Sequence, residues 1–158
     1  MIEIFSVCIG ALIAMVATSI NNKFILSREE KHEKIREKMK EIDTLILLNK
    51  KINEILVKRD LNLDFYQSFD SFDDVYITID DYVYLQSFCA QNHFYLPSFL
   101  VEEFFKEFNH RQAIYNPDDV IRLGGHTYKG AKMVLENFSE QLLRCAEDRK
   151  AELQQLKK

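Results

Sequence analysis

Residues 2–20 form an unbroken apolar run in which the only charged side chain is Glu3. An α-helix of this length rises about 28 Å, close to the roughly 30 Å hydrocarbon thickness of a bilayer. The run has no amphipathic face, which argues against a helix buried in the core of a globular domain. We therefore expect residues 1–22 to be a transmembrane anchor and residues 23–158 to form one domain.

The flanks of this run indicate how it is used. A signal peptide normally begins with basic residues, and none precedes the run. The small residues near Ala14 and Ala17 could suit a signal peptidase, so a cleaved signal peptide remains the alternative. Basic side chains follow the run, at Lys23, Arg28, Lys31, Lys34, Arg36, Lys38 and Lys40. The positive-inside rule then predicts a single-pass protein of a cell membrane, such as a bacterial inner membrane, with a cytoplasmic C-terminal domain.

Small residues recur every fourth position within the run. They are Ser6, Gly10, Ala14 and Thr18. Such a stripe lets two helix backbones approach closely in a bilayer. The predicted partners are therefore the lipid bilayer and either a second copy of the chain or another membrane protein.

The rest of the chain predicts a mainly α fold, a helical bundle with two long helices at about 28–58 and 128–156. Ser27 and Glu30 have the spacing of a capping box that would begin the first helix. One apolar seam of that helix is Ile35, Met39, Ile42 and Ile46, and a neighbouring stripe is Leu45, Leu48, Ile52 and Ile55. The last helix carries a core-facing seam of Tyr128, Ala131, Leu135, Phe138, Leu142 and Cys145. Their similar lengths favour antiparallel packing of the two helices.

Shorter helices are predicted between the two long ones. The first covers about 72–91, the second 97–115, and the third begins at Asn116 and Pro117 and ends at Gly124 and Gly125. Residues 75–79 are β-branched and aromatic, so they could also form a strand. No partner strand is evident elsewhere in the sequence, which favours a helix.

Charge is unevenly distributed along the chain. Residues 60–105 contain nine acidic side chains and no Lys or Arg. Five of these acids are candidates for binding a basic partner: Asp70, Asp73, Asp74, Asp80 and Asp81. The alternative is that they cap helices and keep the domain soluble. Basic residues are interleaved with Glu in residues 28–41, so we expect no nucleic-acid partner.

Few residues suggest catalysis. The three cysteines are widely spaced and form no metal-ligand motif with the four histidines. The glycine-rich segment around Lys129 lacks the spacing of a phosphate-binding loop. We therefore expect no catalytic, cofactor-binding or metal-binding residues and no cofactor.

One pair of residues suggests a different function. Arg122 and His126 resemble the Arg and His of helical ribonucleases of the HEPN type, in which the His follows four to six residues after the Arg. The polar residue that usually follows the Arg is Leu123 here. The sequence therefore favours a membrane-anchored interaction or scaffold protein over an enzyme. The alternatives are a membrane-tethered effector such as a HEPN-like ribonuclease and a small subunit of a larger membrane complex.

Overall fold

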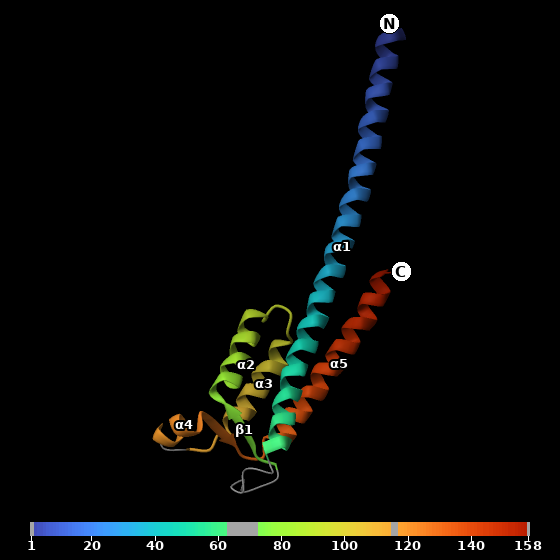
Figure 1. Ribbon diagram of the computed structural model, residues 1–158. Helices are drawn as coiled ribbons and strands as arrows, with labels where there is room; N and C mark the ends of the chain where they lie inside the picture. The colour runs from blue at the N-terminus through green and yellow to red at the C-terminus, as the bar shows by residue number, and fades with distance from the viewer. Residues whose placement is uncertain (1, 63–72, 115–116, 158) are drawn as a thin grey trace.

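The computed structural model describes residues 2–62, 73–114 and 117–157. Within these ranges, the side chains of residues 2–14, 16, 61, 62, 117, 119 and 123 are not described. The chain is mainly helical, with two short strands (Figure 1). Its elements are α1 (Ile2–Asn62), β1 (Val75–Thr78), α2 (Ile79–Gln91), α3 (Ser98–Asn109), α4 (Pro117–Leu123), β2 (Gly125–Tyr128) and α5 (Lys132–Lys157).

The second half of α1 packs against α5, and the two helices run antiparallel (Figure 1). Helices α2 and α3 lie on one side of this pair, while the first half of α1 extends beyond the other elements (Figure 1). The predicted antiparallel packing of two long helices is therefore confirmed. We call residues 38–157 of this assembly the head.

The core of the head is formed by one stripe of α1 and one seam of α5. The stripe Leu45, Leu48, Ile52 and Ile55 is at most 1% exposed, as predicted. Phe104 of α3 stacks on Phe138 of α5 with ring centroids 4.0 Å apart, and Phe108 stacks on Tyr128 at the same distance. These contacts join α1, α3, β2 and α5 into one apolar cluster.

The predicted start of the first long helix at Ser27 is wrong, because Ser27 lies inside α1. No Gly or Pro occurs between residues 21 and 62 to interrupt the helix. A capping side chain contributes only about 1 kcal/mol, which is less than ending and restarting a helix would cost. Residues 2–62 therefore form one continuous helix.

The predicted helix at 72–91 is also wrong in its first part, because Val75–Thr78 is a strand. It pairs antiparallel with β2, with Val75 opposite Tyr128 and Thr78 opposite Gly125. Val75 and Ile77 are buried, while Tyr76 and Thr78 are partly exposed, which is the period of two that a strand imposes. Helix α2 begins only after Thr78, whose hydroxyl accepts a hydrogen bond from the Asp81 N–H at 3.1 Å.

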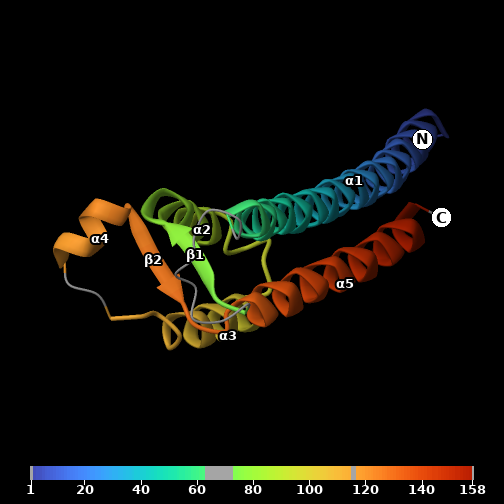
Figure 2. The same ribbon diagram turned by 60° about the horizontal axis from the view of Figure 1, so that its bottom comes forward.

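The partner strand β2 occupies residues that the sequence assigned to a helix–helix turn and to the start of the last helix. Gly124 ends α4 with a positive φ of 71°, so the predicted C-cap signal is confirmed. At Gly125 a Cβ would collide with the carbonyl oxygen of Ile77 across the sheet. This close approach requires glycine, so the pair Gly124-Gly125 both ends a helix and opens a strand. Figure 2 shows the resulting two-stranded ribbon at the end of the bundle.

Part of the predicted apolar seam of α1 is not in the core. Ile42 is buried, but Met39 is 49% and Ile46 40% exposed. The apolar face of α1 is therefore wider than the part of it that packs against the other described elements.

Where its side chains are described, no helix is both long enough and apolar enough to cross a membrane. Most of the predicted anchor, including the side chains of Ser6, Gly10 and Ala14, lies outside these described side chains. Thr18 is exposed, and Asp70 falls outside the described residues.

Two phenylalanines of α3 provide a test of this core. Phe104 is 4% exposed and Phe99 is 75% exposed. We expect Phe104→Ala to lower the free energy of unfolding by about 3–5 kcal/mol, because it leaves a cavity beside Phe138. Phe99→Ala should change it by less than about 0.5 kcal/mol. Urea denaturation of the two variants checks this, and equal losses would show that the faces of α3 are assigned wrongly.

Candidate functional site

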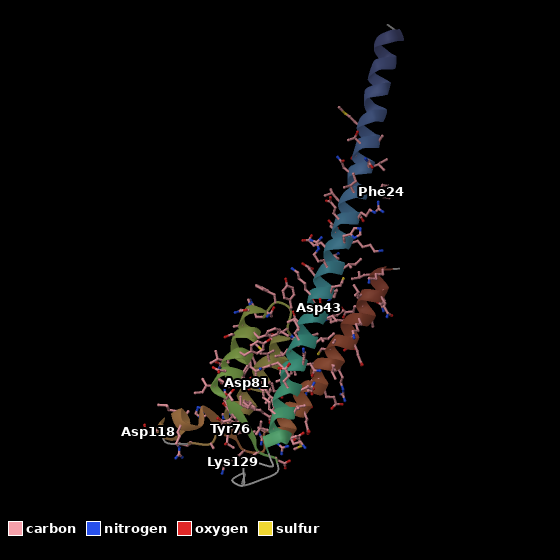
Figure 3. The ribbon with its side chains drawn as sticks, viewed as in Figure 1. Phe24, Asp43, Tyr76, Asp81, Asp118 and Lys129 are labelled. Carbon is pink, nitrogen blue, oxygen red and sulfur yellow. The ribbon has the colours of Figure 1, made fainter. Side chains whose placement is uncertain are left out.

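The first candidate surface is the part of α1 that extends beyond the head, shown with Phe24 labelled in Figure 3. Its described apolar side chains are exposed: Met15 71%, Ile20 51%, Phe24 73%, Ile25 47% and Leu26 57%. Covering exposed apolar side chains is favourable in water. Contiguous exposed apolar patches therefore mark sites of contact with another protein or with a membrane. Met15 and Ile20 belong to the apolar run of residues 2–20, and Phe24, Ile25 and Leu26 follow it after Asn21, Asn22 and Lys23.

A four-residue ionic network marks the place where α1 enters the head. Lys38 of α1 contacts Glu41 and Glu152, each at 2.9 Å, and Arg149 of α5 contacts Glu41 at 3.0 Å. Hydrogen bonds from Lys38 and Arg149 lower the pKa of Glu152. The network ties the C-terminal part of α5 to α1.

Two of the five candidate acids are used inside the head. Asp81 is 6% exposed, and its carboxylate accepts hydrogen bonds from Lys51 at 2.6 Å and Lys58 at 3.0 Å, both from α1. Burial alone would raise the pKa of Asp81, but the two lysines lower it more, and the net pKa lies below its ordinary value. Lys51 also lies 4.9 Å from the Tyr84 ring centroid. Asp81 therefore joins α2 to α1.

Asp74 has a similar internal role at the other end of the sheet. It is 3% exposed, and its carboxylate accepts a hydrogen bond from the Gly130 N–H at 2.8 Å. Its carbonyl oxygen accepts one from the Arg59 side chain at 2.9 Å, and that arginine is itself 3% exposed. The two buried acids are therefore satisfied within the fold, Asp81 by two lysines of α1 and the Asp74 carboxylate by the backbone N–H of Gly130.

Two candidate acids remain on the surface. Asp73 and Asp80 are exposed, at the two ends of β1. The structure thus divides the predicted acidic set into buried members that hold the fold and exposed members that can meet a partner. Binding of a basic partner stays a prediction for the exposed members.

Arg122 and His126 come from adjoining elements, the end of α4 and the middle of β2. Arg122 is exposed and His126 is partly buried. The ring atom Nδ1 of His126 is buried and has no hydrogen-bond partner among the described residues.

No group of His, Cys, Asp or Glu side chains capable of holding a metal occurs among the described residues. Cys89 is buried, and burial raises the pKa of its thiol to about 11. A thiol with such a pKa is a poor nucleophile near neutral pH.

One surface feature was missed by the sequence reasoning. Phe94, in the connection between α2 and α3, has a side chain that is 82% exposed. It lies beside a groove of about 90 Å³. The groove is lined by Leu45, Tyr95, Leu96, Pro97, Cys145 and the Glu41–Arg149 ion pair. No periodicity distinguishes Phe94 in the sequence, because aromatic residues are frequent throughout residues 65–115.

The chain matches no model of a known protein family, no curated protein and no solved structure.

The lowered pKa of Asp81 predicts how the free energy of unfolding depends on pH. A carboxyl whose pKa is lower in the folded state stabilises that state above its unfolded pKa of about 3.9, and this stabilisation is lost as the pH falls through the folded value. We therefore expect Asp81→Asn to lower the free energy of unfolding at neutral pH, with the deficit shrinking below about pH 4. Denaturation curves from about pH 7 to about pH 2.5 measure it. Asp80→Asn is the matched control, and a pH-independent deficit in Asp81→Asn would contradict the assignment.

Proposed function

We propose that the chain is a single-pass membrane protein whose helical head is an interaction or scaffold module in the cytoplasm. The observation that carries this proposal is the extension of α1 beyond the head, with exposed apolar side chains from Met15 to Leu26. A solvated stalk would normally carry polar residues around its whole circumference. In the described structure no element covers the exposed apolar side chains of this end of α1, and insertion of residues 2–20 into lipid would cover Met15 and Ile20.

The continuity of α1 supports a defined spacing between membrane and head. If the anchor ends near Asn22, the stretch to Lys38 rises about 24 Å. Lys23 and Arg28, near its start, lie within about one Debye length of the bilayer surface, where they would meet anionic headgroups. The basic side of the boundary would then be cytoplasmic.

The anchor and its orientation are tested together. Removal of residues 2–22 should shift the protein from the membrane fraction to the soluble fraction, because the apolar run is lost. In the full chain, a reporter that is active only in the cytoplasm should be active when fused after Lys158. A periplasm-specific reporter active at this site would contradict the orientation. A deletion variant still in the membrane fraction after a high-salt wash would contradict the anchor.

The head is proposed to bind a basic partner through its exposed acids. Charge reversal at Asp73 and Asp80 should reduce recovery of that partner in a pull-down from solubilised membranes by about tenfold, since both charges would then repel it. Asp118→Lys, on α4, is a matched control because Asp118 is also an exposed acid. An equal loss of partner recovery in both variants would show that binding depends on the net charge of the protein and not on the surface around Asp73 and Asp80.

The second candidate is a membrane-tethered ribonuclease that uses Arg122 and His126. Its supporting observations are their adjoining elements and the unpaired Nδ1 of His126. If the protein is a scaffold, Arg122→Ala and His126→Ala, alone or together, should leave its cellular phenotype intact. Loss of the phenotype in folded variants that still bind their partner would favour the nuclease.

A further inference from the structure

The α1–α5 pair has one side that α2 and α3 cover and one side that no element of the described structure covers. The apolar residues of the uncovered side are Met39, Ile46 and Val57 of α1 and Leu143 of α5, which are 49%, 40%, 57% and 45% exposed. We call these four residues the outer face. On α1 it is turned away from Lys51 and Lys58, which contact α2. The sequence assigns Met39 and Ile46 to an apolar seam, and the head leaves them without cover.

The register between α1 and α5 places two of these residues side by side. Ser139 donates a hydrogen bond to the side chain of Asn49 at 2.6 Å, and Arg149 pairs with Glu41 at 3.0 Å. In an antiparallel pair these two contacts set Leu143 at the height of Ile46. A two-fold axis parallel to the helices keeps every residue at its height, so it brings Ile46 of one copy against Leu143 of the other.

One set of charges around this contact is complementary under the same axis, while the exposed acids Asp43 and Glu147 lie at similar heights on the two helices. Lys50 of α1 is exposed one turn from Ile46, and Glu136 and Glu140 of α5 are exposed at a similar height. Among the described residues, the two glutamates form exposed ion pairs with Lys132 and Arg144, and such pairs contribute little to stability. Lys50 of one copy would therefore face the two glutamates of the other, twice in the assembly.

We propose that the outer face binds a second copy of this chain, with α1 and α5 of the two copies forming a parallel, two-fold symmetric four-helix bundle. An isologous contact of this kind needs only one self-complementary surface. Both copies would then send their α1 extensions in the same direction, as insertion into one membrane demands.

The sequence of the anchor fits this arrangement. Ten turns of an α-helix take about 36 residues, the spacing that separates Gly10 from Ile46 and Ala14 from Lys50. In the sequence, two residues of the small-residue stripe therefore stand a whole number of helical turns before Ile46 and Lys50. The support from this spacing rests on the proposed membrane anchor, whereas the support from the apolar contact and from the charges does not.

The experiment measures energy transfer between full-length chains that carry a donor or an acceptor fluorescent protein after Lys158. The wild type should show transfer that saturates with expression level. Ile46→Glu and Leu143→Glu should each weaken apparent association at least about tenfold by burying a charge in the contact. Leu47→Glu is the matched control on α1, at an apolar site that is 52% exposed and lies outside the outer face, and it should keep wild-type transfer.

Charge exchange provides a second readout that does not depend on apolar packing. Lys50→Glu should reduce transfer, and adding Glu136→Lys and Glu140→Lys to the same chain should restore it. Absence of transfer in the wild type, persistence of transfer in both outer-face variants, or an equal loss in the Leu47 variant would overturn the proposal. Transfer measured in the soluble fraction, if the chain is found there, keeps this outcome separate from failure of the membrane anchor.

Discussion

The packing of α5 against the second half of α1 is the contact on which the rest of the structure depends. Its apolar part consists of Leu45, Leu48 and Ile52 against Leu135 and Leu142, all at most 1% exposed. A buried hydrogen bond between Ser139 and Asn49 crosses the same interface and specifies its register. Helix α3 packs on α5 through the stack of Phe104 on Phe138, so it is placed by the same pair.

The end of α1 organises the two-stranded sheet by polar contacts. Arg59 reaches the carbonyl oxygen of Asp74, and the Asp74 carboxylate accepts the Gly130 N–H. One buried arginine therefore connects the last turn of α1, through Asp74, to both strands at one end of the ribbon. Two strands alone are marginally stable in water, so β1 and β2 need this attachment and the burial of Val75, Ile77 and Tyr128.

The long stretch of α1 outside the head gives the molecule two parts with different physical roles. The head is stabilised by its own core, while the extension has exposed apolar side chains from Met15 to Leu26. The proposed membrane anchor would bury exposed apolar side chains of the extension, and the proposed two-fold bundle would bury those of the outer face. Such surface is costly in water, and covering it is the most direct use that the geometry suggests.

Local patterns in the sequence determined most helices, because the 3.6-residue apolar period and Gly124 are local signals. They identified the stripe from Leu45 to Ile55, the seam of α5 and the antiparallel pairing of the long helices. Tertiary structure decided what local patterns leave open. Val75–Thr78 became a strand because Gly125–Tyr128, 50 residues away, offers it backbone hydrogen bonds, and pairing at that distance leaves no periodic trace in either segment. It also decided that Asp74 and Asp81 are buried, because only the packed fold brings Lys51 and Lys58 to the Asp81 carboxylate and the Gly130 N–H to that of Asp74. Met39 and Ile46 are exposed because no element of the described structure covers that side of α1.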